Sequence, residues 1–470
     1  MIAETRTPVA DTTAAPARLG LQLPALALGF VMATLDTTIA NVAGPSLRSG
    51  LGMSLSGLTW VMSGYVLAFA SLLLLAGSLA GRHGARRVYL AGLGLFTAAS
   101  VLCAAAPVAG VLVAARLLQG AGAALFMPSS LTLLLAAFPD SRERARVLGL
   151  WSAIVSTAAG VGPALGGALV GAFGWRSIFL INLPVGLAGL VLARRHVTEV
   201  PGRPGALGVG GHALGLLALA GLSYGLIQGP EAGWTSPVVL GSLAVAVLAA
   251  VAFGARERRS AQRIVPAELI ADSRFRAAGL IGFLFNFALY GGMFALALFF
   301  QQARGAGPVV AGLELLPAQL VWLVGNVLYS RLGRRLGNRT ALTASLGLAA
   351  AGMLVLALTI SPAMPYWVIA VLLAVINLGV GVASPAMTGA LMEAAGPAHA
   401  GIAGASLNAN RQIGSLVGIA VMSAVLSGTS GWYPGIAMVF ALMTAAYAAG
   451  SLTGRLGLRA GHRASGVPES

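Results

Sequence analysis

The sequence predicts an all-α integral membrane protein that crosses the bilayer fourteen times. Hydrophobic residues make up 57% of its 470 residues and charged residues only 9%, whereas soluble chains carry roughly 25% charged residues. A spanning helix needs about 20 mostly apolar residues, and fourteen such runs are separated by charge clusters or Pro/Gly turns. Their approximate bounds are 21–43, 57–80, 88–107, 109–134, 147–171, 176–194, 208–228, 236–254, 277–302, 309–330, 340–360, 366–391, 401–427 and 434–454.

The arginines test this number of spans, because cytoplasmic loops carry most basic residues of a membrane protein. With the N-terminus placed in the cytoplasm, only Arg48, Arg176 and Arg304 fall outside, while Arg116 and Arg411 lie within predicted spans. All other arginines then fall in cytoplasmic loops or tails. Adding or removing one span would put several clusters on the wrong side. The distribution therefore predicts a multi-pass protein of the inner, cytoplasmic membrane with both termini in the cytoplasm.

Composition also excludes several classes of protein. All 29 basic residues are arginines, and without lysine neither a P-loop nor a Schiff-base enzyme is expected. The net charge of +16 comes from short clusters between apolar runs, with no basic face carrying aromatic residues, so nucleic acid is not an expected partner. The histidines form no metal-ligand cluster, and the single cysteine, Cys103, is expected to be a small core residue. We therefore expect that the protein is not an enzyme and that it holds no cofactor or metal. The sequence has no repeated filter motif, so a channel is not expected either.

An internal repeat divides the chain into two halves. The pattern L-x-x-R-x-G-x-R begins at Leu79 and again at Leu328, with Arg82 and Arg331 249 residues apart. Six helices would give a shorter period, so two extra helices are predicted between two six-helix bundles. Secondary transporters commonly place the substrate between two such bundles near the midplane. The expected organisation is a cytoplasmic tail over 1–20, an N-terminal bundle over 21–200, a linker with the two extra helices over 201–260, a C-terminal bundle over 261–456 and a cytoplasmic tail over 457–470.

Several motifs occur in order along the chain. They are Leu35-Asp36-Thr37-Thr38-Ile39-Ala40-Asn41-Val42-Ala43, Gly77 to Arg87, Ala115 to Gly120, Gly160 to Gly167, Trp175-Arg176 through Asn182-Leu183-Pro184, Gly312 to Pro317, and Leu407 to Gln412. With these motifs the sequence resembles the fourteen-helix drug:proton antiporters of the major facilitator superfamily over nearly its whole length.

The resemblance implies the major facilitator fold and the export of a small-molecule drug or antibiotic in exchange for protons by alternating access. A major facilitator importer, or an exporter of a different small metabolite, is the alternative. The implied partners are protons, the drug and the lipid bilayer, and a monomer is expected.

Asp36 and Arg116 are the charges predicted within spans of the first half. A carboxylate facing lipid would cost roughly 2.5–3.5 kcal/mol, so Asp36 is expected to face a cavity, where alternating solvation would let it bind and release a proton. Arg116 shares a helix face with Gln119 and Gly120, and the resemblance associates it with proton transfer. The alternatives are a structural anchor for Asp36 and a fixed ion pair for Arg116, whose carboxylate partner the sequence does not identify.

Glu314 and Arg411 are the corresponding charges of the second half, and all four are assigned to proton coupling. Glu314 lies near the outer end of its span, where a purely interfacial position fits equally well; the resemblance favours a functional acid. Arg411 belongs to a polar stripe with Asn408, Gln412 and Ser415, which must line a cavity or a helix contact.

Polar and aromatic residues in several spans are expected to line the substrate cavity, although each could instead make a helix contact. They are Asn41, Gln119, Asn286, Tyr290, Trp322, Asn326, Asn408 and Gln412.

Two glycine-containing segments complete the predicted site. The loop after the second span, with Gly77, Arg82, Gly84, Arg86 and Arg87, resembles a gating loop of the family, but Gly81 replaces the acid usually found there. In the fifth span, small residues permit close helix packing, and their order is typical of antiporters in the superfamily. They are Gly160, Gly162, Pro163, Gly166 and Gly167.

Overall fold

The computed structural model describes residues 16–138, 140–202, 209–259, 266–396 and 399–458. Within these ranges there is no strand, and fourteen helices are long and apolar enough to cross a membrane. The predicted number of spans is therefore confirmed. The first helix begins at Pro16, inside the segment expected to be a tail, and most of both predicted tails lies outside the described residues.

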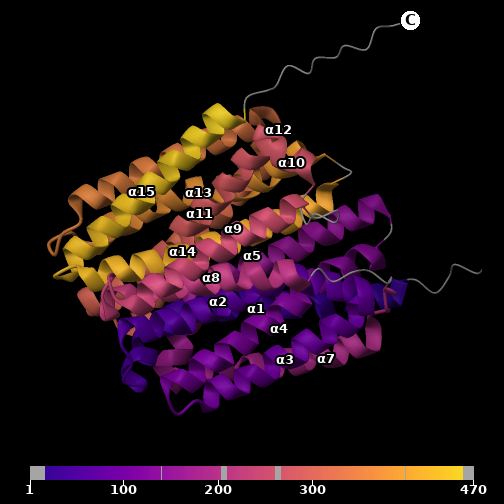
Figure 1. Ribbon diagram of the computed structural model, residues 1–470, viewed down its shortest axis with the longest axis horizontal. Helices are drawn as coiled ribbons and strands as arrows, with labels where there is room; N and C mark the ends of the chain where they lie inside the picture. Colours follow the sequence, from indigo (N-terminus) through magenta and orange to yellow (C-terminus); the bar gives the residue numbers. More distant parts are fainter. Residues whose placement is uncertain (1–15, 139, 203–208, 260–265, 397–398, 459–470) are drawn as a thin grey trace, which may run out of the picture.

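The helices of the first half pack together as one bundle, drawn in indigo and purple in Figure 1. They are α1 (Pro16–Gly50), α2 (Leu55–His83), α3 (Ala85–Ala105), α4 (Ala109–Ala137), α5 (Ser141–Phe173), α6 (Ser177–Leu180) and α7 (Asn182–His196). The sixth predicted span is not one continuous helix, because it is interrupted at Ile181 between α6 and α7. Tyr89, Phe96 and Phe126 stack edge to face in the buried core between α3 and α4.

The helices of the second half form the other bundle. They are α11 (Ser273–Leu298), the π-helical turn η1 (Phe299–Ala303), α12 (Pro308–Thr359), α13 (Tyr366–Ala395), α14 (Ala400–Gly428) and α15 (Trp432–Gly457), with the short α10 (Ala267–Ala271) before them. α12 contains two spans, and the chain turns between them at Gly337, whose φ of +72° suits a residue without a side chain.

α11 begins with a side-chain cap. Asp272 accepts a hydrogen bond of 2.7 Å from the backbone N–H of Arg274. Partial burial of the carboxyl raises its pKa, but the hydrogen bonds and the charge of Arg274 outweigh this effect, and the net result is a lowered pKa. The acid therefore stabilises the helix start in its ionised form.

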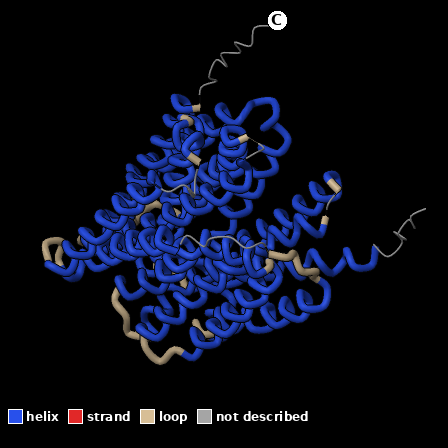
Figure 2. Tube along the Cα trace, turned by 45° about the vertical axis from the view of Figure 1, so that its right-hand side comes forward, coloured by secondary structure: helices blue, strands red, loops and turns tan. Residues whose placement is uncertain are grey.

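The two predicted extra helices are α8 (Val209–Ala232) and α9 (Pro237–Arg259). α8 packs on α2 of the first bundle and on α14 of the second, and α9 packs mainly on α8 (Figure 1). In Figure 2, which is coloured by secondary structure, the described residues are helices joined by loops. α8 and α9 approach closely: a Cβ atom on Gly221 would lie 2.6 Å from the carbonyl oxygen of Ser242. The pair thus bridges the two bundles on one side of the molecule.

The two copies of the repeated pattern do not break the helix at the same position. The pattern pairs Gly84 with Gly333, but Gly333 lies inside the helix, and the positive-φ breaks are at Gly84 (φ +97°) and Gly337 (φ +72°). The second break therefore comes four residues later, about one helical turn.

When the two halves are aligned on these breaks, they match in detail. Arg86 and Arg339, each two residues after the break, donate to the carbonyl oxygens of Arg194 at 2.6 Å and Arg455 at 2.9 Å. Those carbonyls lie near the ends of α7 and α15, the last helices of their bundles. Each loop therefore ties its own bundle together.

The two bundles are hydrogen-bonded to each other at only one end, within the described ranges. This is the arginine-poor end, where α1 ends at Gly50 and α2 begins at Leu55. There Gln301 donates to the carbonyl of Val42 at 2.7 Å, Arg48 donates to Gln302 at 3.3 Å, and the hydroxyls of Thr59 and Ser423 are hydrogen-bonded.

The opposite, arginine-rich half of α14 is packed differently. Residues 408–413 are all only partly buried, whereas 414–416 are buried. The bundles are therefore closed together at the arginine-poor end.

Candidate proton and substrate site

Asp36 and Arg116 form an ion pair inside the first bundle. Arg116 Nη1 donates to Asp36 Oδ2, and both side chains are 1% exposed. The Nε of Arg116 also donates to the carbonyl of Val61 at 3.1 Å, and its guanidinium lies 4.6 Å from the ring centroid of Tyr65. The carboxylate partner of Arg116, which the sequence left open, is therefore Asp36.

Two amides complete the surroundings of the carboxylate. Asn182 donates to Asp36 Oδ1 at 3.1 Å and Gln119 donates to the same oxygen at 3.3 Å. Gln119 also accepts from Arg116 at 2.8 Å and donates to the hydroxyl of Ser100 at 2.7 Å. This network joins α1, α3, α4 and α7, so a change at Asp36 reaches most of the bundle.

The expectation that Asp36 faces a cavity is wrong for this conformation. The residue is 3% exposed and its carboxylate is enclosed by hydrogen-bond donors. A buried carboxylate is tolerable in a membrane when it is paired and hydrogen-bonded. Here side chains of the bundle, instead of water in a cavity, supply the hydrogen bonds to the carboxylate.

Asn182 and Ser100 were not predicted from the sequence as parts of this site. Asn182 was noted only within the motif Asn182-Leu183-Pro184, and its position at the start of α7, after the interruption at Ile181, was the available signal. Cys103 is buried, as expected for a core residue, and its thiol also donates to Gln119 at 3.2 Å. Ser100 and Cys103 lie one turn apart on α3, a spacing that the sequence does show.

The glycines of the predicted antiporter motif in α5 have unequal surroundings. A Cβ atom on Gly162 would lie 2.0 Å from the hydroxyl of Thr38, and one on Gly166 would lie 3.0 Å from Ile39 Cα, so both face α1. A Cβ atom on Gly167 would lie 2.4 Å from the Pro308 carbonyl, across the bundle interface. Gly160 has no neighbour within 4 Å of such an atom.

Pro163 of the same motif also contacts the other bundle. A Cβ atom on Gly312 of α12 would lie 2.4 Å from the Pro163 carbonyl oxygen. α5 and α12 therefore meet backbone to backbone near the arginine-poor end, and small residues on both helices make that approach possible.

Three of the residues predicted for proton coupling or for the substrate cavity each have a buried polar atom without a hydrogen-bond partner. They are Asn41 Oδ1, Glu314 Oε2 and Trp322 Nε1. Unpaired buried polar atoms are uncommon and call for an explanation, such as a proton, water or ligand. Glu314 lies within electrostatic range of Arg304, not of Arg411.

Among the described residues, the structure brings no carboxylate to Arg411. Its side chain is partly buried and makes no ion pair or hydrogen bond with a described residue. Asn408 and Gln412, on the same stripe of α14, are also partly buried. Tyr290 of α11 lies within electrostatic range of both Arg411 and Tyr65, and so stands between the two bundles.

Two other amides predicted to line the cavity bond within their own helices. Asn286 is 2% exposed and donates to the Gly282 carbonyl at 2.8 Å. Asn326 is partly buried and donates to the Trp322 carbonyl at 3.3 Å. Asn286 is therefore enclosed in this conformation.

The predicted gating loop has a carboxylate that the motif itself lacks. Glu199, in the segment after α7, accepts a hydrogen bond of 2.9 Å from the backbone N–H of Arg86 and lies 3.9 Å from Arg87 Nε. Gly81 and Gly77 have open space around a Cβ position, whereas one on Gly84 would lie 2.6 Å from Glu199 Oε1. Arg82 is exposed. Glu199 thus supplies an acid to the loop from a distant part of the sequence.

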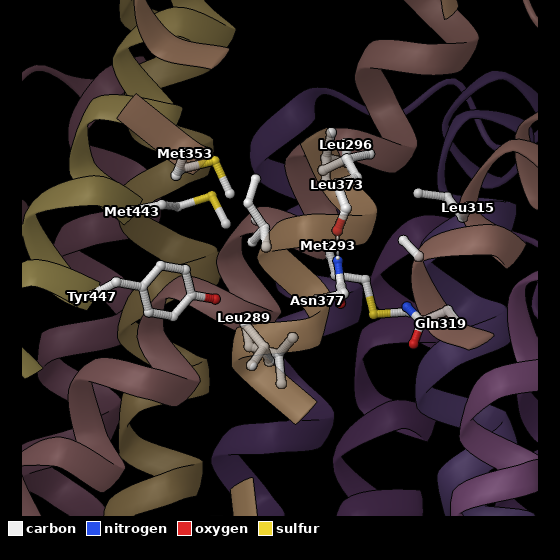
Figure 3. Close-up of a pocket in the computed structure, with 14 residues that line it drawn as sticks. Leu289, Met293, Leu296, Leu315, Gln319, Met353, Leu373, Asn377, Met443 and Tyr447 are labelled. Carbon is white, nitrogen blue, oxygen red and sulfur yellow. Dashed lines mark hydrogen bonds between the residues drawn. The ribbon is translucent and has the colours of Figure 1, made fainter. Parts of the chain in front are cut away.

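A small cavity lies inside the second bundle, between α11, α12, α13 and α15 (Figure 3). Figure 3 shows Asn377 and Gln319 among methionine and leucine side chains, with Tyr447 at one side. Its volume of about 40 Å³ is enough for a few water molecules, since one needs roughly 10–15 Å³ on this scale. It contains none of the eight predicted cavity residues and is too small for a drug.

The arrangement is that of a multi-pass transporter: two helical bundles, an enclosed charge network in one, and in the other an arginine that pairs with no acid of the described ranges. The sequence agrees with this class, because residues 26–419 match the family model described as Major Facilitator Superfamily. The chain belongs to this family.

Close relatives cover nearly the whole chain. It is 54% identical to a "Methylenomycin A resistance protein" of Streptomyces coelicolor, over 92% of this chain and 91% of the relative. It is 52% identical to a protein of the same name in Bacillus subtilis, over 91% and 92% of the two chains. It is also 36% identical to "Multidrug resistance protein Stp" of Mycobacterium tuberculosis, over 87% and 76%.

Among solved structures, the crystal structure of the peptide transporter POT in complex with sulfate has a similar fold. The TM-score is 0.69, the sequence identity is 16%, and the match covers 95% of both chains. At this identity the match shows the fold alone, and it confirms the predicted fold class.

Proposed function

We propose that this protein exports a small-molecule drug or antibiotic in exchange for protons. The observation that carries the proposal is the similarity at 54% identity, over 92% of this chain, to a protein named for resistance to methylenomycin A. Resistance by export requires a transporter, and membership of the Major Facilitator Superfamily supports this class rather than an enzyme.

We place the arginine-rich end in the cytoplasm, together with both termini, because positive residues are retained on that side. The hydrogen-bonded, arginine-poor end then faces outward, and the substrate of an exporter would enter between the bundles from the cytoplasmic end. The units that rock in a monomer are the bundles 21–200 and 261–456, with 201–260 as the linker. The gating loop and Glu199 lie on the cytoplasmic side.

We assign proton coupling in the first bundle to Asp36 and Arg116. A proton on Asp36 would remove the negative charge that holds Arg116 and would weaken the bonds from Asn182 and Gln119. Buried ion pairs rarely add stability over apolar packing, and their best-attested use is in specificity and switching. Glu314 is the second candidate, because a proton would give its enclosed Oε2 the ability to donate.

The test is to measure drug export driven by a pH gradient in proteoliposomes containing Asp36→Asn. We expect gradient-driven export to fall by roughly tenfold or more, a loss of about 1.4 kcal/mol or more in the coupled step. The substitution also leaves Arg116 buried without a counter-charge, and breaking a buried pair costs about 3–5 kcal/mol. A folding defect must therefore be separated from a coupling defect.

The double variant Asp36→Asn with Arg116→Gln makes this separation, because it removes both charges together. If the pair couples protons, the double variant folds like the parent protein but does not accumulate drug against a gradient. Parental gradient-driven export by the double variant would show instead that the pair is a structural anchor. Drug export by the parent protein that does not depend on the proton gradient would contradict proton antiport altogether.

A further inference from the structure

Arg411 is a positive charge deep in the second bundle that no described acid neutralises. It lies eleven residues into α14, which begins at Ala400, and so about 16 Å from that end of the helix at 1.5 Å per residue. The described ion pairs are Arg87 with Glu199, Arg116 with Asp36, and Arg274 with Asp272. A membrane-embedded charge without a partner is costly and points to a function.

Neither Asp36 nor Glu314 forms an ion pair with Arg411 in this conformation. Asp36 is bonded to Arg116, Asn182 and Gln119 within the first bundle. Glu314 lies in the electrostatic range of Arg304. In this conformation Arg411 therefore has no described carboxylate beside it whose proton affinity it could change.

The surroundings of Arg411 are rich in hydrogen-bond donors. Asn408 lies one turn before Arg411 and Gln412 directly follows it; both side chains are partly buried and carry amide N–H groups. The hydroxyl of Tyr290 lies within electrostatic range of the guanidinium. Residues 408–413 are all partly buried, whichever face of α14 they lie on.

The charges near the two bundles' meeting point do not cancel. The pair of Asp36 and Arg116 is neutral as a unit, and no described acid forms an ion pair with Arg411. One net positive charge therefore remains, on a group whose planar fork of donors matches a carboxylate.

We propose that Arg411 binds a carboxylate of the transported molecule, so that the substrates of this exporter are small organic acids. The inference rests on the proposed export function and gives it a substrate class. It also changes the role of Arg411 from proton coupling to substrate binding, with Asn408, Gln412 and Tyr290 as further donors to the acid.

The proposal has an electrical consequence. If one proton enters for each monoanion that leaves, two charges cross the membrane in every cycle, whereas a neutral ester would move one and a monocation none. Export of an acid should therefore depend on membrane potential more strongly than export of its ester.

The first experiment measures binding to the purified full-length protein by its thermal unfolding temperature. The probes are benzylpenicillin, fusidic acid and mycophenolic acid, each beside its methyl ester, and the cation ethidium. We expect at least one acid to bind more tightly than its ester. Loss of charge-assisted hydrogen bonds should weaken that acid roughly tenfold or more in Arg411→Gln.

Two further variants serve as controls. Arg411→Lys keeps the charge but not the fork, and should retain part of the preference for the acid. Arg195→Gln removes one exposed arginine at the end of α7 and should bind like the parent. The proposal is overturned if no acid binds better than its ester, if ethidium is preferred over every acid, or if Arg411→Gln keeps the preference.

Proteoliposomes with imposed pH gradients and potassium diffusion potentials separate this proposal from the export function. Acid binding that depends on Arg411 without proton-driven movement would refute antiport and leave the binding site standing. Proton-driven movement of esters and cations that Arg411→Gln does not alter would overturn the carboxylate site and leave antiport standing.

Discussion

Asp36 shows how a single residue joins the parts of the first bundle. Its carboxylate accepts from Arg116, Asn182 and Gln119, which lie on α4 and α7. Enclosing a charge in this way strengthens each electrostatic contact, and it makes the loss of any one donor costly. The residues that hold the carboxylate should therefore set the pH at which the site works.

Asn182→Ala tests this expectation. The substitution removes one donor to the ionised carboxylate, so the site should take up a proton more readily and the pH profile of export should move toward higher pH. The measurement is the initial rate of export as a function of pH. Ser129→Ala, which removes a hydroxyl bonded only to its own helix, is the control. An unchanged profile with a reduced rate would mean that Asn182 only supports the fold.

The sequence predicted the charged residues of this site but not their grouping. Charges within apolar runs are visible in any sequence, because their burial is costly, and so Asp36 and Arg116 were found. Their contact joins residues 80 positions apart, and no local pattern encodes such a pairing. Ser100 and Asn182 were missed because uncharged polar residues are common in membrane helices.

At the scale of elements, α5 is a helix of the first bundle that packs both on α1 of the same bundle and on α12 of the second bundle. Its surface of small residues allows the backbone of α12 to approach Pro163 and Gly167. Side chains of ordinary size would hold these helices apart. The closed arginine-poor end therefore depends on a few positions without side chains.

Gly167→Ala should weaken this closure, because the added methyl group would lie 2.4 Å from the Pro308 carbonyl oxygen. We expect a lower yield of cross-linking between the bundles at that end, and export slower by several-fold, for a clash of about 1–3 kcal/mol. Gly160→Ala is a matched control in the same motif, because its methyl group would meet no atom within 4 Å. Equal effects of the two substitutions would contradict this account.

The elements themselves were predicted well, and their irregular points were not. Long apolar runs determined the fourteen spans because the hydrocarbon core requires them. The break at Gly337 lies between the predicted spans 309–330 and 340–360, but the repeat does not single out this glycine, since many glycines are present and only the folded backbone selects one for positive φ. The acid of the gating loop was missed for a similar reason: Glu199 lies far from the motif in sequence.

At the scale of the molecule, the bundles are joined by hydrogen bonds at the arginine-poor end, among the described residues. Thr59 of α2 and Ser423 of α14 form one of these bonds across the interface. Alternating access requires that such contacts break when the outer side opens. A covalent link between these two positions should therefore stop the transport cycle.

A covalent link between Thr59→Cys and Ser423→Cys, with Cys103→Ser to remove the native thiol, should abolish export. Reduction of the link should restore export to the level of the unlinked variant. The control is Leu342→Cys with Gly454→Cys, within the second bundle, where the Cβ atoms would lie 3.6 Å apart, inside the range for disulfides. Normal export by the first variant when fully linked would exclude opening of the bundles at this end.

Membrane topology was predictable from the sequence, whereas the arrangement of the bundles was not. The uneven distribution of arginine predicted an even number of spans, and the surplus length between the repeats predicted α8 and α9. The contacts between Gln301 and Val42, or between Thr59 and Ser423, join the two halves of the chain. They depend on which conformation the bundles adopt, so composition and spacing carry no signal for them.

The bonds from Arg86 to the end of α7 and from Arg339 to the end of α15 have a mechanical consequence. Each fastens an early helix of a bundle to its last one, so a load applied to one helix is shared by its whole bundle. Pulled from its two ends, the chain should give way in two large steps rather than helix by helix.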